Sequence, residues 1–339
     1  MPARCTRREA LALAVAAAAL ASCLACAIPP ATPLDPRGRT WLSPHGQDHP
    51  LVGHCIVPGR AEHLAPEEIA ERLAAARHIL FGETHDNPDH HLLQAEAIRA
   101  LVAAGRRPAV AFEMIAEDRR EALRRHLAAN PRDAAGLGAA LGWAESGWPD
   151  WAIYQPVAEA ALEAGLALEP ANLDRATVRE LSRGASHDLR ARLGLDEPLP
   201  EALARSLRRE IVEAHCGYAD DAAVEGMALG QRARDAQMAL RLHQAGAADG
   251  AVLIAGAGHC RTDRGVPYYL RRHDTRARVL SLAFIEVSPE RLSAGDYADA
   301  KDEPQLPYDL VYFTPRIDAR DACQRFREQL EKMRPKPAA

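Results

Sequence analysis

Three apolar segments that end in polar residues constrain the fold of this chain most strongly. Each has the length and composition of a buried strand and leads into turn or glycine residues. In open α/β sheets, ligands bind at the carboxyl ends of the strands. The sequence therefore predicts that two carboxylates and two imidazoles converge on one edge of a sheet. The segments are 79–82, 108–112 and 251–258, and the side chains that follow them are Glu83 and His85, Glu113, and His259.

The order of the other segments predicts an α/β fold, with a mostly parallel sheet and helices on both faces. Helical and strand patterns alternate on both sides of residues 173–245. Within 173–245 the pattern is almost entirely helical, which predicts a helical insertion of about two to four helices. The expected strands are 51–60, 108–113, 166–168, 251–256, 277–287 and 309–313, and the expected helices are 88–104, 117–129, 152–164, 266–273 and 318–333.

The N-terminal residues predict export and a lipid anchor. Three arginines precede a short apolar run at 10–20, which is too short to cross a bilayer and is typical of a signal peptide. Residues 20–23 (Leu-Ala-Ser-Cys) match a lipobox, so we expect cleavage after residue 22 and lipid, such as palmitate, on Cys23. Leu24 in place of an aspartate favours the outer membrane. The alternative is an ordinary secreted protein cleaved after an alanine, and Sec or twin-arginine export stays open.

Composition and charge limit the domain organisation and the kinds of binding site that the rest of the chain can have. Residues 23–50 contain six prolines and no periodic apolar pattern, which predicts a tether before a single domain at 51–339. The net charge of -5 does not indicate a positively charged surface of the kind that binds nucleic acid. Beyond Cys23, five cysteines remain without a C-x-x-C pair, which argues against a cysteine-based zinc site. One disulfide is compatible with this set, but the sequence does not identify its partners.

The four polar residues at the strand ends could bind a metal ion or act as acid and base. A buried Glu83–His85 pair would perturb the pKa values of both groups, a property that catalysis uses. Glu113 follows an apolar strand, where a carboxylate is costly unless paired, and His259 follows two glycines. The alternative is that these residues have structural roles only. Glu83 would then cap a helix and His85 would be solvated. Glu113 would form an ion pair in the core, and His259 would be a loop histidine bonded to the backbone. Replacing Glu83 or His85 by alanine is expected to abolish function and leave the fold largely intact.

Further side chains are weaker candidates for cofactor binding. Asn172 follows another predicted strand, and Arg234 and Asp235 lie on a helix late in the helical region. For the last two, a solvated helix face is the alternative. His90 and His91 are adjacent and should point to different faces of their helix, so both cannot easily serve one metal ion.

Six short motifs occur along the chain in a specific order. They are LFGETHDNPDHH (80–91), AFEM (111–114), WPDWAIY (148–154), ANL (171–173), RDAQMA (234–239) and AGAGHCRTDRGVP (255–267). In this order they resemble the ChaN family of haem-binding, iron-regulated lipoproteins, which is related to Tiki and erythromycin-esterase-like proteins. The resemblance spans about residues 70 to 290. It implies an α/β fold with a helical insertion and a shared polar site at Glu83, His85, Glu113 and His259.

The resemblance also implies haem as the cofactor and a role in haem or iron uptake at the bacterial cell envelope. The implied partners are the membrane, an outer-membrane haem receptor and a second copy of the chain. We expect haem in a crevice between the sheet edge and 173–245. Haem iron is commonly held by His, Tyr, Met or Cys, and the first ligand candidates are Tyr154, Tyr268 and His215.

A metal-dependent or acid/base hydrolase is the alternative function. The cluster of Glu83, His85, Glu113 and His259 is rich in carboxylate, which suits a divalent metal ion or proton transfer better than haem. The tryptophans at 143–151 and Tyr154 do not distinguish the two functions. They could form a corner of the core or stack against a flat apolar ligand.

Overall fold

The computed structural model describes residues 33–60, 62–184, 186–298, 304–321, 323–324 and 327–328. The chain divides after Thr32, and its second unit is Pro33–Ala339. The signal peptide and the lipidation site Cys23 that the sequence predicts lie outside the described residues. Of the expected helix 318–333, residues 318–321 are not helical, 323–324 and 327–328 are helical, and the rest lies outside the described residues. Among the described residues, no helix is both long enough and apolar enough to span a membrane.

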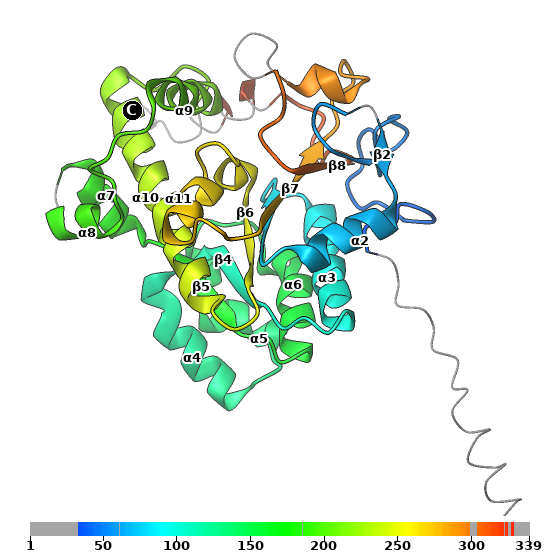
Figure 1. The fold of residues 1–339 in the computed structure, drawn as a ribbon, viewed down its shortest axis with the longest axis horizontal. Coiled ribbons are helices and arrows are strands. Elements are labelled where there is room, and N and C mark those ends of the chain that lie inside the picture. The colour runs from blue at the N-terminus through cyan, green and yellow to red at the C-terminus, as the bar shows by residue number, and fades with distance from the viewer. Residues whose placement is uncertain are drawn as a thin grey trace, which may run out of the picture. The chain divides into compact units, whose positions relative to one another are not determined.

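Eight strands form one mixed, mostly parallel sheet, which confirms the predicted α/β class (Figure 1). From β8 to β5 all neighbours are parallel, and the short β1 and β2 close the sheet in antiparallel pairs. The sheet order is β2-β1-β8-β7-β3-β6-β4-β5. The strands are β1 Cys55–Ile56, β2 His63–Leu64, β3 His78–Glu83, β4 Ala109–Ala116, β5 Leu168–Asn172, β6 Ala251–Gly256, β7 Val279–Glu286 and β8 Leu310–Thr314.

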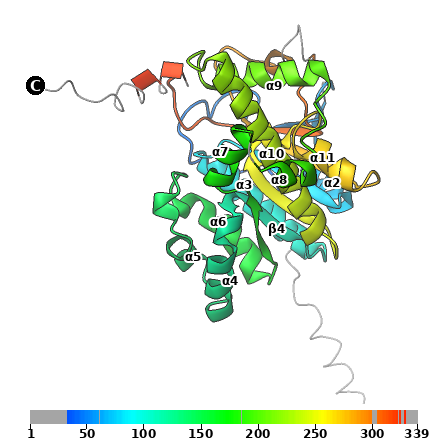
Figure 2. The same ribbon diagram turned by 90° about the vertical axis from the view of Figure 1, so that its left-hand side faces the viewer.

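Helices cover both faces of the sheet, as the sequence predicts (Figures 1 and 2). Alternate side chains of β3 enter the two cores: Ile79 and Phe81 pack with α3 and α6, whereas Leu80 packs with α10 and α11. The helices are α2 Pro66–Ala75, α3 Pro88–Ala103, α4 Arg120–Ala129, α5 Ala134–Ala140, α6 Trp151–Glu163, α7 Arg175–Ser182, α8 His187–Arg192, α9 Glu201–Ala214, α10 Asp221–Ala245 and α11 Val266–His273. The predicted helical insertion is thus formed by α7 to α10.

The predicted tether is too long, because residues 33–50 pack on the folded domain. Leu34 is fully buried, and its carbonyl accepts a hydrogen bond from the Tyr312 hydroxyl (3.2 Å). The Ser43 hydroxyl donates to Asn87 Oδ1 (2.9 Å), and its main-chain N–H donates to Asp89 Oδ2 (2.8 Å). A few isolated contacts of this kind leave no periodic apolar pattern in the sequence. The proline content alone therefore places the start of the folded domain too late in the chain.

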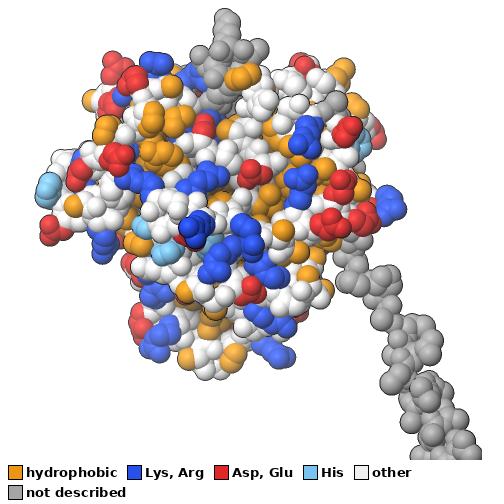
Figure 3. All heavy atoms as spheres, in the orientation of Figure 1, with side chains coloured by type: hydrophobic (Ala, Val, Ile, Leu, Met, Phe, Trp, Pro, Cys, Tyr) orange, Lys and Arg blue, Asp and Glu red, His pale blue; other side chains and the backbone are white. Residues whose placement is uncertain are grey.

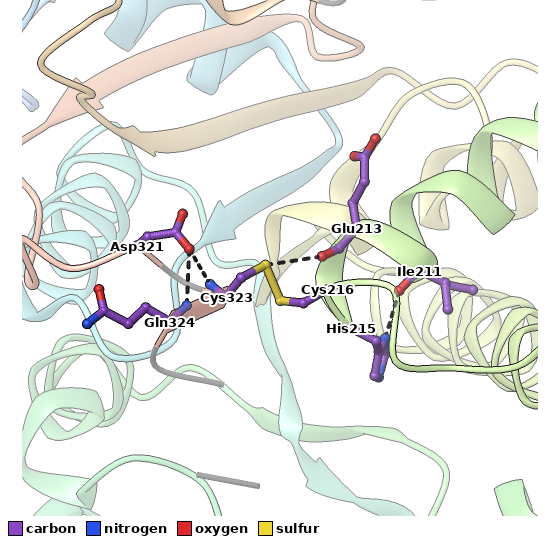
Figure 4. The surroundings of a disulfide bond; sticks show 7 residues. All are labelled: Ile211, Glu213, His215, Cys216, Asp321, Cys323 and Gln324. Carbon is purple, nitrogen blue, oxygen red and sulfur yellow. Dashed lines mark hydrogen bonds between the residues drawn. A yellow bond between two sulfur atoms is a disulfide. The ribbon is translucent and has the colours of Figure 1, made fainter. Parts of the chain in front are cut away.

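A disulfide joins Cys216, between α9 and α10, to Cys323 near the C-terminus (Figure 4). The two residues are 107 positions apart. Cys55 and Cys260 are buried free thiols. The single disulfide that the sequence allowed therefore links the helical insertion to the end of the chain.

Charged side chains of both signs cover the face in Figure 3, and arginines gather around the C-terminal ends of α10 and α11. Three of the exposed arginines are Arg272, in the last turn of α11, and Arg276 and Arg278, between α11 and the start of β7. This group lies at the amino edge of the parallel strands, opposite to the edge where ligands bind.

Candidate functional site

Glu83, the last residue of β3, is the centre of a buried polar network. Its side chain is fully buried. Oε1 accepts from His85 Nδ1 (3.0 Å) and from the Tyr154 hydroxyl (3.2 Å). Oε2 accepts from Gln94 Nε2 (2.6 Å) and lies 3.3 Å from His91 Nδ1. Burial alone would raise the pKa of Glu83, but the charge of His91 and hydrogen bonds from both histidines hold it well below its usual range.

A second chain of contacts runs through His259. Its Nδ1 lies 2.6 Å from Asp235 Oδ1, and its Nε2 lies 3.2 Å from Glu113 Oε1. The Gly256 main-chain N–H donates to Glu113 Oε2 (2.8 Å). Burial opposes the charge of His259, but the two carboxylates raise its pKa to about 10. Burial also opposes the charge of Glu113, but His259 lowers the pKa of that carboxyl to about 2.

The sheet register brings these two chains of contacts together. Glu83 pairs with Gly256 across β3 and β6, and Phe112, just before Glu113, pairs with Ile254. His85 Nε2 lies 3.9 Å from Glu113 Oε2 and so connects the chains. A Cβ atom at Gly256 would lie 2.9 Å from that nitrogen, so only glycine fits there. The structure thus brings together the four residues that the sequence singled out.

The network balances its own charge. Burial opposes ionisation of His85 and His91, but neighbouring carboxylates raise the pKa values of both imidazoles. Burial raises the pKa of Asp235 to about 6, although His259 favours its ionised form. The groups that face one another are the carboxyl groups of Glu83, Glu113 and Asp235 and the imidazoles of His85, His91 and His259.

Two sequence interpretations change at this site. Asp235 is buried and bonded to His259, so the interpretation as a solvated helix face is wrong for it. His91 belongs to the network although the sequence ranked it among weaker candidates, because α3 is buried on more than one face. His90 points elsewhere, as expected for an adjacent residue, and its Nε2 lies 2.7 Å from Thr314 Oγ1.

Asn172 and Arg234 connect the network to a cavity. Asn172 Nδ2 donates to the main-chain oxygen of Glu113 (3.0 Å), and its Oδ1 accepts from Arg234 Nη1 (3.0 Å). The cavity has a volume of about 560 Å³, within the range typical of ligand sites. Residues of five stretches of the chain line it, among them Glu113, Trp143, Trp148, Asn172, Arg175, Arg234 and His259.

The three expected haem ligands occupy different places. Tyr154 is fully buried beneath the network, where its hydroxyl contacts Glu83 and the main-chain oxygen of His85. Tyr268 lies on α11 and His215 ends α9, and neither lines the cavity. The structure confirms core packing for two of the tryptophans, and stacking against a ligand stays a prediction. Trp143 and Trp151 pack in the core, whereas half-buried Trp148 lies edge-on to His85, with ring centroids 4.9 Å apart.

The donor groups do not fit a metal site in their present arrangement. Among the described residues, no group of three or more His, Cys, Asp or Glu side chains could hold a metal ion. The imidazole nitrogens of His85 and His259 are instead directed at the carboxylates of Glu83 and Glu113.

The raised pKa of His259 predicts a loss of stability in alkali. A folded-state pKa of about 10, against 6.5 for an ordinary histidine, stabilises the fold fully below pH 6.5 and progressively less towards pH 10. We expect the free energy of unfolding to fall by more than about 1 kcal/mol between pH 6 and pH 9.5. Urea denaturation at both values measures it. The variant His259→Gln should lose much less over this interval, and an equal loss in both proteins would contradict the assignment.

The fold and site define an α/β protein with a ligand cavity at the carboxyl edge of its sheet. The model of the family described as haem-binding uptake, Tiki superfamily, ChaN, matches residues 69–270, which is more than half of the chain. The chain therefore belongs to this family, as its motifs indicated.

The solved structures similar to this chain include those of three other proteins, and the first of them shares its fold. The ChaN of Campylobacter jejuni, described with cofacial haem binding, is 20% identical, with a TM-score of 0.57 over 74% of this chain and 92% of that one. The type III effector HopBA1 is 16% identical, with a TM-score of 0.40 over 73% and 92%. The erythromycin esterase EreC, in its open conformation, is 13% identical, with a TM-score of 0.40 over 76% and 95%. No curated protein sequence matches the chain significantly.

Proposed function

We propose that this protein binds haem in the cavity at the carboxyl edge of its sheet. Membership of the haem-binding ChaN family, taken with the composition of that cavity, carries the proposal. Haem is a flat apolar ring with two carboxylates. The cavity wall combines the indole ring of Trp148 with the guanidinium groups of Arg175 and Arg234, which suit the two parts of such a ligand.

We further propose that the protein handles haem or iron at the bacterial cell envelope, anchored to the outer membrane through lipid on Cys23. The lipobox at residues 20–23 supports the anchor. The Cys216–Cys323 disulfide supports an extracytoplasmic compartment, because disulfides persist in oxidising environments and are rare in the cytosol. An outer-membrane haem receptor and a second copy of the chain are the partners we propose.

Titration with haemin tests the proposed function. We expect a saturable Soret band whose position differs from that of free haemin. Ala176, an exposed residue in the first turn of α7, lines the cavity, so the variant Ala176→Trp should obstruct it. That variant should bind haemin about tenfold more weakly or worse, which corresponds to about 1.4 kcal/mol.

The matched control is Ala128→Trp. Ala128 is an exposed alanine on α4 and does not line the cavity. The control variant should bind haemin as the wild type does. A wild-type spectrum that matches free or merely adsorbed haemin would contradict haem binding, and equal weakening by both tryptophans would contradict the cavity as its location.

A second candidate function is acid/base hydrolysis at the same cavity. His259 and Glu113 both line the cavity, and both have strongly shifted pKa values, which is common among catalytic groups. Hydrolysis of a carboxylic ester by the wild type, and its loss in His259→Gln, would favour this function. The same rate in both proteins would exclude His259 as the acid or base.

A further inference from the structure

Arg234 lies at the cavity wall without a carboxylate partner. Its Nη1 donates to Asn172 Oδ1 (3.0 Å) and approaches the Leu173 main-chain oxygen (3.4 Å). These acceptors are neutral dipoles. Among the residues that the structure describes, no aspartate or glutamate oxygen lies within ion-pair distance of this guanidinium. Two amide contacts fix one edge of the guanidinium fork, and its Nε and Nη2 donors have no acceptor among the residues that the structure describes.

A second arginine increases the positive charge at this wall. Arg175, the first residue of α7, also lines the cavity, and its Nη2 donates only to the Ser146 main-chain oxygen. Burial lowers the pKa of Arg234; the charge of Glu113 opposes this shift, and the charge of Arg175 adds to it. Two guanidinium groups therefore line the same cavity without an ion-pair partner among the described residues, and an anion there would accept charge-assisted hydrogen bonds from them.

Most of the acidic groups near these two arginines contact other residues. Glu113 and Asp235 both contact His259, and their charges belong to the balanced network. Asp174 caps α7: its Oδ1 accepts from the Thr177 main-chain N–H (2.9 Å) and its Oδ2 from the Thr177 hydroxyl (2.6 Å). The other acids that line the cavity are Asp118, whose Oδ2 lies 3.6 Å from Arg119 Nε, and the exposed Glu145. Among the described residues, no carboxylate forms an ion pair with Arg175 or Arg234.

We propose that Arg234 and Arg175 form an anion-binding subsite that holds an acidic group of the ligand at the cavity wall. If the ligand is haem, as proposed above, this group is one of its two propionates. Arg234 is the positioned member, because Asn172 holds it and Asn172 is itself bonded to the main chain of Glu113. The subsite would therefore fix the orientation of the ligand relative to Glu113 and His259.

The test compares haemin with its dimethyl ester, which keeps the ring and lacks both carboxylates. Soret titrations measure both affinities in the wild type and in Arg234→Gln and Arg175→Gln. We expect the wild type to bind haemin about ten- to a hundredfold more tightly than the ester, as for a charge-assisted hydrogen bond. Arg234→Gln should lose most of this preference by weakening haemin binding, while the affinity for the ester stays unchanged.

Arg276→Gln is the charge-matched control. Arg276 is exposed at the opposite edge of the sheet and should alter neither affinity. A wild-type preference that survives in both Arg234→Gln and Arg175→Gln would overturn the subsite and leave haem binding intact. Equal weakening of haemin and ester binding by Arg234→Gln would also overturn it, since that pattern indicates a general loss of the cavity.

A second measurement keeps the subsite testable if no haemin binds. Succinate and inorganic phosphate, each compared with chloride at equal ionic strength, should raise the melting temperature of the wild type but not of Arg234→Gln. A larger effect of succinate indicates a carboxylate ligand, and a larger effect of phosphate indicates a phosphorylated one. If neither anion distinguishes the two proteins and no haemin preference exists, the subsite is absent.

Discussion

Replacing Glu83 by alanine is expected to lower the free energy of unfolding by about 3–5 kcal/mol. The fully buried carboxylate accepts from or faces two imidazoles, one amide and one hydroxyl. Its removal would leave the buried side chains of His91, Gln94 and Tyr154 without this acceptor. Urea denaturation at pH 7 measures the loss.

Two comparisons separate this effect from a general cost of mutation. Glu71 is exposed on α2, so Glu71→Ala should change the free energy of unfolding by no more than about 0.5 kcal/mol. Glu83→Gln should lose less than Glu83→Ala, because the amide oxygen still accepts hydrogen bonds. A loss in Glu83→Ala as small as that in Glu71→Ala would contradict the buried network. The sequence-based expectation of an intact fold is thus revised for Glu83.

Removing the disulfide with Cys216→Ser and Cys323→Ser is expected to cost about 2–4 kcal/mol of folding free energy. The cross-link closes a loop across 107 positions and so restricts the unfolded chain strongly. Denaturation with and without reductant measures the effect: reductant should destabilise the wild type and leave the double variant unchanged. Peptide mapping that finds both thiols free in the unreduced native protein would contradict the pairing.

The sequence located the core of the site because its chemistry follows local pattern. Glu83, Glu113 and His259 each follow an apolar run that only a buried strand explains, and parallel strands bring such ends to one edge. That reasoning needs no knowledge of the helices. It places residues at an edge, but it does not give the contacts between their side chains.

The partners from helices could not be obtained in the same way. Asp235 reaches His259 only because α10, 25 residues long, crosses the sheet so that this part of it is buried. Gln94 and His91 contact Glu83 because α3 is covered on more than one face, which its sequence does not indicate. The partner of Cys216 depends on where a distant chain end lies, which no local pattern encodes.

The location of haem iron in a crystal grown with haemin tests the central proposal most directly. An anomalous difference map recorded at the iron absorption edge should contain a single strong peak inside the cavity lined by Glu113, Trp148 and Arg234. A peak on another surface of the molecule, or no peak in crystals that contain haemin, would contradict haem binding at the carboxyl edge of the sheet.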